Sequence, residues 1–541
     1  MSDLDAPPAP QNEPIRTYAP GTADRAALKA ELTRMRGEVA DIPMVIAGRE
    51  IRTGKTIDVR SPHDKALLLG RAHEGNAEHA RQAIDASLAA QGPWSRLAQR
   101  DRDAVFLKAA ELAATTWRAR LNAATMLGQS KTAFQAEIDS ACELIDFWRF
   151  NVHFASRLLE PLVQAPNTWN RVEARPLEGF VAAITPFNFT AIAGNLPTAP
   201  ALLGNACVWK PSPLALRSAH VVMSLLREAG LPDGVINLVL GPAEEIVGVC
   251  VDHPRLAGIH FTGSTTVFRS ILGRVGSNMG KYHGYPRLVG ETGGKDFVFA
   301  HASADVDALA VALARGAFEY QGQKCSAASR AYIPKSLWPA LKDRLVALMQ
   351  TIGVGDVSDF RNLMGAVIDG RAFAKHKAVI DEAKSASEYR LVHGGRTDDE
   401  TGWFVHPTLV ESKSPTSRLM TEEFFGPILT VWVYDDARLD EALAACDEGS
   451  AYALTGAVFA RDRAFLAHAT GRLRDAAGNF YLNDKPTGAV VGQQPFGGAR
   501  GSGTNDKAGS ALNLLRWMSP RTIKETFVPP TELGYPSMLE P

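Results

Sequence analysis

The stretch from Gly179 to Phe261 limits the fold more than any other part of the chain. It contains four short and continuously apolar segments, each followed by a turn and a helix-like segment: Phe180–Ile184, Ala206–Trp209, Ile236–Leu240 and Gly258–Phe261. Continuous apolar strands separated by helices are typical of a parallel sheet that is covered on both faces. In such α/β sheets a nucleotide binds beyond the carboxyl ends of the strands.

The rest of the chain is predicted to be mostly helical before this stretch and again alternating after it. Strand–helix alternation resumes near Asp296 and continues to about Asn479, with helices expected over 304–318 and 337–352. Earlier helices are expected over 22–39, 77–90, 97–116 and 131–159, and a short strand pair over 45–59. Residues 1–20 are rich in Pro and Ala and are expected to be loosely ordered. A chain of 541 residues is too long for one core and suggests about three domains.

Composition excludes several classes of protein. A formal net charge of −1 gives no positive field that would attract nucleic acid. The five cysteines are odd in number and form no C-x-x-C pair, which is typical of a reducing compartment without disulfides. The 13 histidines are scattered, so no metal site is expected. No targeting segment and no run of 18 apolar residues is visible, and we therefore expect a cytoplasmic protein that binds no membrane.

Two short motifs carry reactive groups. Cys325 lies in Gly322–Arg330, after a glycine-bearing turn, and Glu291 lies between glycines in Gly290–Lys295. A thiolate that attacks a carbonyl, with a carboxylate that accepts a proton from water, is sufficient for covalent acyl chemistry. Taken alone, Cys325 is more simply a small buried hydrophobe and Glu291 an exposed turn carboxylate.

Their surroundings favour the reactive interpretation. With Pro186–Phe189, Phe261–Thr265 and Glu422–Pro427, the two motifs resemble, in order, the aldehyde dehydrogenase superfamily over about Pro43 to Phe527. Two longer strings resemble one branch of it, the L-glutamate γ-semialdehyde (Δ1-pyrroline-5-carboxylate) dehydrogenases: Phe318–Ala327 and Asn483–Gly498.

The resemblance implies an oxidoreductase that uses NAD to oxidise this semialdehyde to L-glutamate in proline catabolism. The main alternative is the same chemistry on another semialdehyde. A cysteine hydrolase would leave Lys210 and the Gly263 turn unexplained, and a non-catalytic protein would not account for Cys325 and Glu291 together.

An aldehyde dehydrogenase-like α/β fold is also implied. We expect a Rossmann-type NAD-binding domain from residues 1–159 and 179–293, and an α/β catalytic domain from residues 294–500. A small β oligomerisation extension is expected from residues 160–178 and 501–541, through which subunits would pair as a homodimer or a higher homo-oligomer.

The nucleotide site is not marked by a standard motif. No G-x-G-x-x-G occurs, and the near-match to a P-loop at 290–295 is one residue short. Instead, Phe261–Thr266 leads from a strand into a helix N-terminus, which can hold a pyrophosphate. The resemblance assigns eight residues to the cofactor: Thr185, Lys210, Ser212, Gly241, Gly263, Ser264, Glu423 and Phe425. Of these, Glu423 and Phe425 would hold the nicotinamide ribose and ring. Alone, Glu423 and Phe425 would be a solvated carboxylate and a core aromatic.

One position departs from the family pattern. Many NAD-preferring relatives carry a glutamate three residues after the lysine that matches Lys210, and this chain has Pro213 there. Because no anion then repels a 2′-phosphate, we expect NAD to be preferred and NADP to be tolerated.

The resemblance also assigns the chemical steps and the substrate contacts. Cys325 attacks the aldehyde, the Asn188 amide and the Cys325 backbone N–H stabilise the oxyanion, and Glu291 activates the hydrolytic water. Asn188 alone would more simply be a turn residue. At the amino-acid end of the substrate, the Glu143 carboxylate would hold the ammonium group. The Gly488 and Ala489 backbone and the Ser326 hydroxyl would donate to the substrate carboxylate. Two aromatic rings, Phe189 and Phe496, would enclose the aliphatic part. Alone, Glu143 would be a solvated helix residue. The branch often has serine at the place of Ala489, and we expect little effect because the contact is through the backbone.

Overall fold

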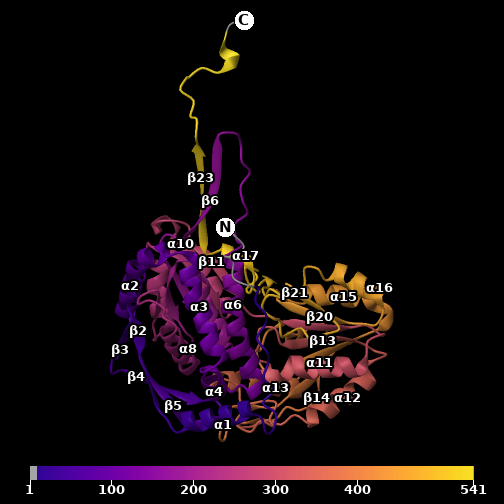
Figure 1. The fold of residues 1–541 in the computed structure, drawn as a ribbon. Coiled ribbons are helices and arrows are strands. Elements are labelled where there is room, and N and C mark those ends of the chain that lie inside the picture. Colours follow the sequence, from indigo (N-terminus) through magenta and orange to yellow (C-terminus); the bar gives the residue numbers. More distant parts are fainter. Residues whose placement is uncertain (1–8, 540–541) are drawn as a thin grey trace.

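Two seven-stranded sheets lie side by side, each covered by helices, and a two-stranded ribbon projects away from both (Figure 1). The computed structural model describes residues 9–539. Among them, no helix is both long enough and apolar enough to cross a membrane.

The first sheet is built around the four predicted strands. β7, β8, β9 and β10 pair in parallel with one another and with β11, and β2 and β3 extend the sheet in antiparallel fashion beside β9. The order across the sheet is β11 (Arg287–Glu291), β10 (Leu256–Thr262), β7 (Phe180–Ile184), β8 (Ala206–Lys210), β9 (Ile236–Leu238), β2 (Met44–Ile46) and β3 (Arg49–Ile51). The prediction of a parallel sheet is confirmed.

Helices cover both faces of this sheet, as its apolar strands require. The helices of this half, some of which pack on other helices, are α1 (Ala23–Arg36), α2 (Ala77–Arg96), α3 (Gln99–Ala114), α4 (Arg118–Gln129), α5 (Ala133–Ala136), α6 (Glu143–Ala155), α7 (Thr190–Leu202), α8 (Leu216–Glu228), α9 (Ala243–Asp252), α10 (Thr265–Ser277), η3 (Met279–Lys281) and α17 (Ala511–Leu515). Two sequence predictions need correction. The pattern predicts no helix where α4 lies, and the single helix expected over 131–159 is interrupted by a π-helical segment, Glu137–Cys142. Such π segments are frequent at functional sites.

The second sheet contains the strands of the later alternation. All neighbouring pairs are parallel except β14 with β17. The order is β14 (Tyr389–His393), β17 (Thr408–Ser412), β18 (Ile428–Tyr434), β13 (Ala328–Pro334), β12 (Asp296–Ala300), β20 (Thr455–Phe459) and β21 (Asn479–Leu482). Its helices are α11 (Val306–Phe318), η4 (Glu319–Gly322), α12 (Trp338–Gln350), α13 (Gly370–Ser385), α14 (Arg418–Thr421), η5 (Asp436–Arg438), α15 (Leu439–Glu448) and α16 (Arg463–Arg472).

Small sheets complete the structure. β1 (Ala40–Ile42), β5 (Asp64–His73) and β4 (Thr56–Ser61) form one, and β15 (Thr397–Asp398) with β16 (Phe404–Val405) and β19 (Tyr452–Ala453) with β22 (Ala499–Arg500) form two pairs.

The N-terminal segment is more ordered than its composition suggests. Tyr18 is only 4% exposed, and its hydroxyl donates to Glu137 over 2.7 Å. The Arg16 backbone N–H also donates to Glu137, over 2.9 Å. The prediction of loose order is therefore wrong for residues 9–20, because polar contacts to the helices replace the apolar pattern that the segment lacks. Residues 1–8 of that prediction lie outside the described part.

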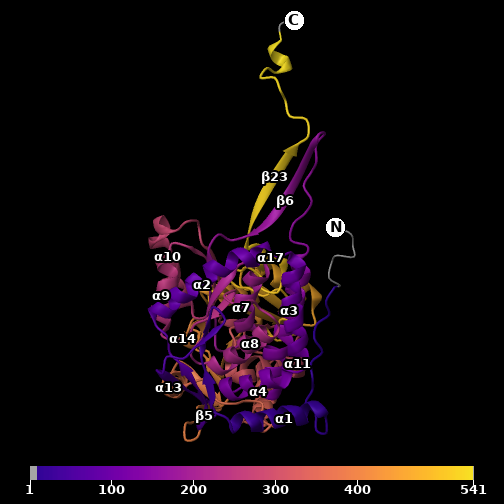
Figure 2. The same ribbon diagram turned by 60° about the vertical axis from the view of Figure 1, so that its left-hand side comes forward.

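The projecting ribbon consists of β6 (Thr168–Pro176) and β23 (Met518–Thr526), paired antiparallel along their full lengths (Figures 1 and 2). Residues 527–539 continue beyond it and include the short helix η6 (Pro536–Met538). The ribbon is shorter than the 501–541 segment of the predicted extension, because Trp517 is fully buried in the first core and its ring packs at a tilt against His260.

Candidate active site

The loop that carries Cys325 has a strained backbone. Tyr320, Gln321 and Gly322 have consecutive positive φ angles of 50°, 55° and 65°. This region is unfavourable for side chains with a Cβ and is often retained at functional sites. A Cβ at Gly322 would also collide with the Gly426 carbonyl oxygen, so only glycine fits.

Two glutamines of the motif hold this loop in place. Gln321 Nε2 donates to the carbonyls of Ser130 and Ala366 over 3.0 and 2.7 Å. Gln323 Oε1 accepts from the Ile368 backbone N–H over 2.9 Å. Ser130 follows α4 beside the first sheet and Ala366 lies beside the second, so Gln321 joins the two halves four residues before the nucleophile. Both glutamines lie in the Phe318–Ala327 motif, but the sequence pattern assigns neither of them a role.

Cys325 lies between two cavities and lines both. The smaller has a volume of about 260 Å³ and the larger about 380 Å³. Cys325 is partly exposed, whereas the other four cysteines are buried. A thiol placed in this way can meet one molecule from each side.

The surroundings of Cys325 favour the neutral thiol. Burial raises its pKa well above the ordinary value, and the nearby carboxyl groups of Asp296, Glu291 and Glu423 raise it further. A raised pKa keeps the thiolate fraction small near neutrality, and this fraction grows as pH rises.

We therefore expect iodoacetamide to alkylate Cys325 slowly near neutrality, with the rate increasing about tenfold per pH unit up to at least about pH 9. The rate is measured by mass spectrometry of the peptide that contains Cys325. The Cys325→Ala variant is the control, because the remaining cysteines are buried. A rate that is already constant above about pH 8 would contradict the raised pKa.

Asn188 lies against the same loop. Its Nδ2 donates to the Gln323 carbonyl over 3.0 Å, and the side chain, 5% exposed, lines the larger cavity with Cys325. The structure thus brings the amide and the thiol to one cavity. The assignment of Asn188 as an oxyanion donor stays a prediction.

Glu291 ends β11 and lies behind the larger cavity, which its neighbours Thr292 and Gly293 line. A Cβ on Gly497 would lie 3.1 Å from Glu291 Oε1, while Oε2 is buried and has no hydrogen-bond partner among the described residues. Burial raises the pKa of this carboxyl well above its usual value. Glu291 itself lines neither cavity, so its predicted role requires the side chain to turn toward Cys325.

The larger cavity contains seven of the eight predicted cofactor residues: Thr185, Lys210, Ser212, Gly263, Ser264, Glu423 and Phe425. Gly241 does not line it. Its φ is +139°, and an added Cβ would lie 2.6 Å from the Gly75 carbonyl oxygen, so a close backbone approach accounts for this glycine. Its assignment to the cofactor stays a prediction.

One end of this cavity can attract an anion. Ser264 caps α10 by accepting from the Val267 N–H over 3.3 Å, and the N-terminus of that helix faces the cavity wall. Lys210 lies nearby, and burial lowers its pKa to about 8. Among the described residues that line the cavity, Glu423 is the only carboxylate. Pro213 also lines the cavity.

Glu423 and Phe425 line the same cavity. Glu423 Oε1 accepts from the Gly294 N–H over 3.0 Å, and burial raises the pKa of the carboxyl. Phe425 has a φ of 59°, and its ring packs edge-on against Phe187 at 5.9 Å. Lys375, which the sequence pattern does not single out, also lines the cavity, and its Nζ donates to the Glu423 carbonyl over 3.1 Å.

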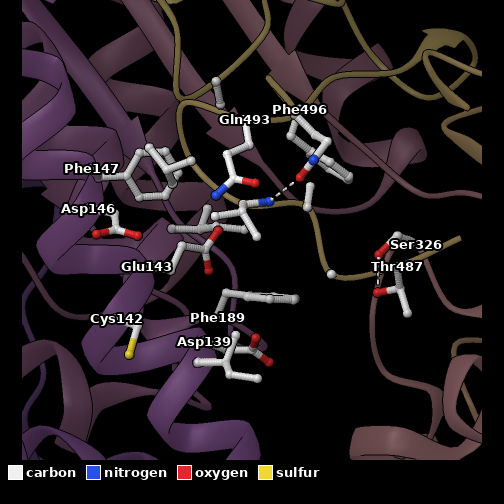
Figure 3. Close-up of a pocket in the computed structure, with 18 of the residues that line it drawn as sticks. Asp139, Cys142, Glu143, Asp146, Phe147, Phe189, Ser326, Thr487, Gln493 and Phe496 are labelled. Carbon is white, nitrogen blue, oxygen red and sulfur yellow. Dashed lines mark hydrogen bonds between the residues drawn. The ribbon is translucent and has the colours of Figure 1, made fainter. Parts of the chain in front are cut away.

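The smaller cavity contains all six residues predicted for the substrate: Glu143, Phe189, Ser326, Gly488, Ala489 and Phe496. Figure 3 labels Glu143, Phe189, Ser326 and Phe496 among them. The hydroxyls of Ser326 and Thr487 lie 2.8 Å apart. Further lining residues that the sequence pattern misses are Asn12, Glu13, Ile15, Asp139, Cys142, Asp146, Phe147, Lys324, Thr487 and Gln493.

Charged groups surround one wall of this cavity. Burial, and then Asp139, raise the pKa of Glu143 well above its ordinary value, although Lys131 and Lys324 act in the opposite direction. Asp139 pairs with Lys131 and lies 3.7 Å from Lys324. The Lys131 ammonium lies over the ring of Phe189, 4.2 Å from its centre, in a cation–π contact.

Comparison with known proteins identifies the family. The aldehyde dehydrogenase family model matches residues 50–523. The chain belongs to the aldehyde dehydrogenase family. The two cavities that meet at Cys325 are thus those of a family member, and the predicted fold class is confirmed.

Individual relatives within the family are similar over their full lengths. The chain is 49% identical to the mitochondrial Δ1-pyrroline-5-carboxylate dehydrogenase of Dictyostelium discoideum, covering 99% of this chain and 96% of the relative. The human protein of that name is 46% identical, with 97% and 94% covered. The crystal structure of the Mycobacterium tuberculosis Δ-pyrroline-5-carboxylate dehydrogenase bound with NAD is 54% identical, with a TM-score of 0.96 and both chains fully covered.

Proposed function

We propose that the chain oxidises L-glutamate γ-semialdehyde, formed by hydrolysis of Δ1-pyrroline-5-carboxylate, to L-glutamate with NAD, as in proline catabolism. The observation that carries this proposal is the position of Cys325 between a nucleotide-sized cavity and a smaller cavity with amino-acid-binding groups. Full-length similarity to proteins named for this activity supports it.

The larger cavity fits NAD by the chemistry of its lining. A helix N-terminus and Lys210 suit the phosphates and the adenosine ribose, and Glu423 suits the hydroxyls of the nicotinamide ribose. When bound, NAD accepts the hydride that the aldehyde carbon loses.

The remaining steps take place on the chain's own residues. The Cys325 thiolate attacks the aldehyde carbon and forms a thiohemiacetal, whose oxyanion accepts hydrogen bonds from the Asn188 amide and the Cys325 backbone N–H. Loss of hydride leaves a thioester on Cys325. Glu291 takes a proton from water, which attacks the same carbon and releases the carboxylic acid and the thiol.

The amino-acid end of the substrate explains the polar groups of the smaller cavity. Its ammonium would pair with Glu143 and lower the pKa that burial has raised. Its carboxylate would accept from the Gly488 and Ala489 backbone N–H groups and from Ser326, while Phe189 and Phe496 enclose the aliphatic chain. A semialdehyde without the amino group would leave Glu143 unpaired, which disfavours the alternative substrates.

The direct test supplies Δ1-pyrroline-5-carboxylate and NAD and follows reduced nicotinamide spectrophotometrically, with L-glutamate quantified as product. We expect kcat/KM to exceed that for succinate semialdehyde by at least about 100-fold, because a buried carboxyl without its partner is costly. Faster turnover of succinate semialdehyde would favour another semialdehyde. Turnover without nicotinamide would indicate a hydrolase.

We expect NADP to support turnover with kcat/KM about tenfold below that of NAD. The reason is that Pro213 leaves no carboxylate to repel a 2′-phosphate, although nothing specific binds it either. Initial rates with each cofactor measure the ratio. In the Pro213→Glu variant the NADP rate should fall selectively, and an absence of any NADP turnover in the unmodified protein would contradict the prediction.

We further propose that the ribbon of β6 and β23 pairs subunits into a homodimer or a higher homo-oligomer. An isolated two-stranded ribbon is marginally stable, and this one exposes Trp169, followed by Phe527 at its end. We also propose that the first sheet forms the NAD-binding domain and the second sheet the catalytic domain. The cytoplasmic location stays a prediction, and several relatives are named as mitochondrial proteins.

A further inference from the structure

Residues 11–16, here called the N-terminal strap, form part of the substrate-cavity wall. Asn12, Glu13 and Ile15 line the cavity together with α6 and the loop 488–494. That loop begins with Gly488 and Ala489, which are proposed to bind the substrate carboxylate. The strap therefore lies where it can influence the proposed carboxylate site.

Asn12 connects the two walls of the cavity. Its Nδ2 donates to Asp146 Oδ2 on α6 and to the Val491 carbonyl on the loop, both over 2.8 Å. Its Oδ1 accepts from Gln493 Nε2 over 2.8 Å. An asparagine amide has two donor hydrogens and one acceptor oxygen, and here every one of these groups is used. Figure 3 shows Asp146 on the helix and Gln493 on the loop opposite.

The strap itself is held firmly enough to fix Asn12. The Glu13 backbone N–H donates to Asp146 Oδ1 over 2.7 Å. The Glu13 carboxylate pairs with Arg118, which is 1% exposed, and with Arg149 at 2.6 Å. A bridging residue can hold a loop only if its own backbone is anchored, and these contacts provide that anchor.

The loop needs such a support. Gly488 and Gly492 have φ angles of +97° and +80°, and glycines have more conformations to lose than other residues. Backbone N–H donors bind an anion well only when they are held in position before it arrives. The contact from Asn12 to Val491 fixes the loop two residues beyond Ala489.

On the basis of the proposed function, we infer that Asn12 is a positioning residue for the carboxylate-binding loop and sets the preference for aldehydes that carry a remote carboxylate. It does not contact the reacting atoms. Its loss should therefore weaken binding of the amino-acid end more than it slows the chemistry at Cys325.

The first test measures kcat/KM of Asn12→Ala with L-glutamate γ-semialdehyde and with butanal, which has no carboxylate. We expect the ratio of the two values to fall about tenfold, mainly through KM for the semialdehyde, because one charge-assisted and two neutral hydrogen bonds are lost. Gln11→Ala, at the exposed neighbouring position, is the matched control and should keep the ratio of the unmodified protein. A purely structural role for Asn12 would lower both values equally and overturn the inference.

A charge exchange gives a second and independent test. Asn12→Asp places a carboxylate against Asp146 and removes both donors, so the ratio should fall further than in Asn12→Ala. Adding Asp146→Asn restores a donor between the two positions. The ratio of the two kcat/KM values should then be at least about threefold higher than in Asn12→Asp alone. No recovery, with both variants folded as judged by thermal unfolding, would contradict the bridge.

If the unmodified protein does not turn over the semialdehyde, the proposed function fails, whereas an active protein with an unchanged Asn12→Ala ratio refutes only the role of Asn12.

Discussion

Replacement of Cys325 by alanine should lower kcat/KM for aldehyde oxidation by at least about 10⁴-fold, since the covalent steps need a nucleophile and no second thiol can take its place. The other cysteine that lines the substrate cavity, Cys142, is buried, and burial and then Glu137 hold its pKa far above the ordinary range. NAD affinity should change by less than about twofold, because the cofactor cavity keeps the rest of its lining.

Activity is measured by reduced nicotinamide and NAD affinity by calorimetry on the same preparation. Cys446→Ala is a matched control, because Cys446 is buried in the core of the second sheet, away from both cavities. Residual activity above about one part in a hundred in Cys325→Ala would show that another group forms the covalent bond.

Replacement of Glu291 by glutamine should separate the two halves of the reaction. Formation of the thioester needs only Cys325 and the oxyanion donors, so we expect a burst of about one reduced nicotinamide per active site. Hydrolysis needs a general base, and steady-state turnover should fall by about 10²- to 10⁴-fold. Stopped-flow absorbance records both phases in one experiment.

Glutamine keeps the shape of Glu291 and removes only its ability to take a proton. Because one carboxyl oxygen is buried without a hydrogen-bond partner in the described structure, the substitution should not lower the thermal unfolding midpoint. Glu388→Gln, at an exposed position, is the control for the substitution itself. A variant with neither burst nor turnover would show that Glu291 acts earlier than the hydrolytic step.

The sequence predicts those parts of the fold that local pattern encodes. β7, β8 and β10 are continuous apolar runs between turns, and they lie in the first sheet as predicted. The residues that line the two cavities were found through motif resemblance, because Glu143 and Ala489 lie far apart in the chain and carry no local signal of a shared site.

The N-terminal strap could not be predicted in the same way. Asn12 bonds to Asp146 and Val491, which are 134 and 479 residues away, and single polar contacts over such separations leave no periodic pattern. Gln321 is a similar case, since its partners are backbone carbonyls, whose positions depend on the fold and not on residue type. Likewise, the sequence pattern predicts an ordinary helix where the π segment before Glu143 lies.

The proposed mechanism depends on one sulfur atom that receives an aldehyde from one cavity while a dinucleotide occupies the other. Its most direct test mixes the Glu291→Gln variant with NAD and Δ1-pyrroline-5-carboxylate, stops the reaction in acid within the burst, and sequences the peptides by mass spectrometry. We expect a γ-glutamyl group on Cys325 in most of the protein, and none when NAD is omitted. A burst of reduced nicotinamide with Cys325 unmodified, or with the acyl group on another residue, would contradict the account.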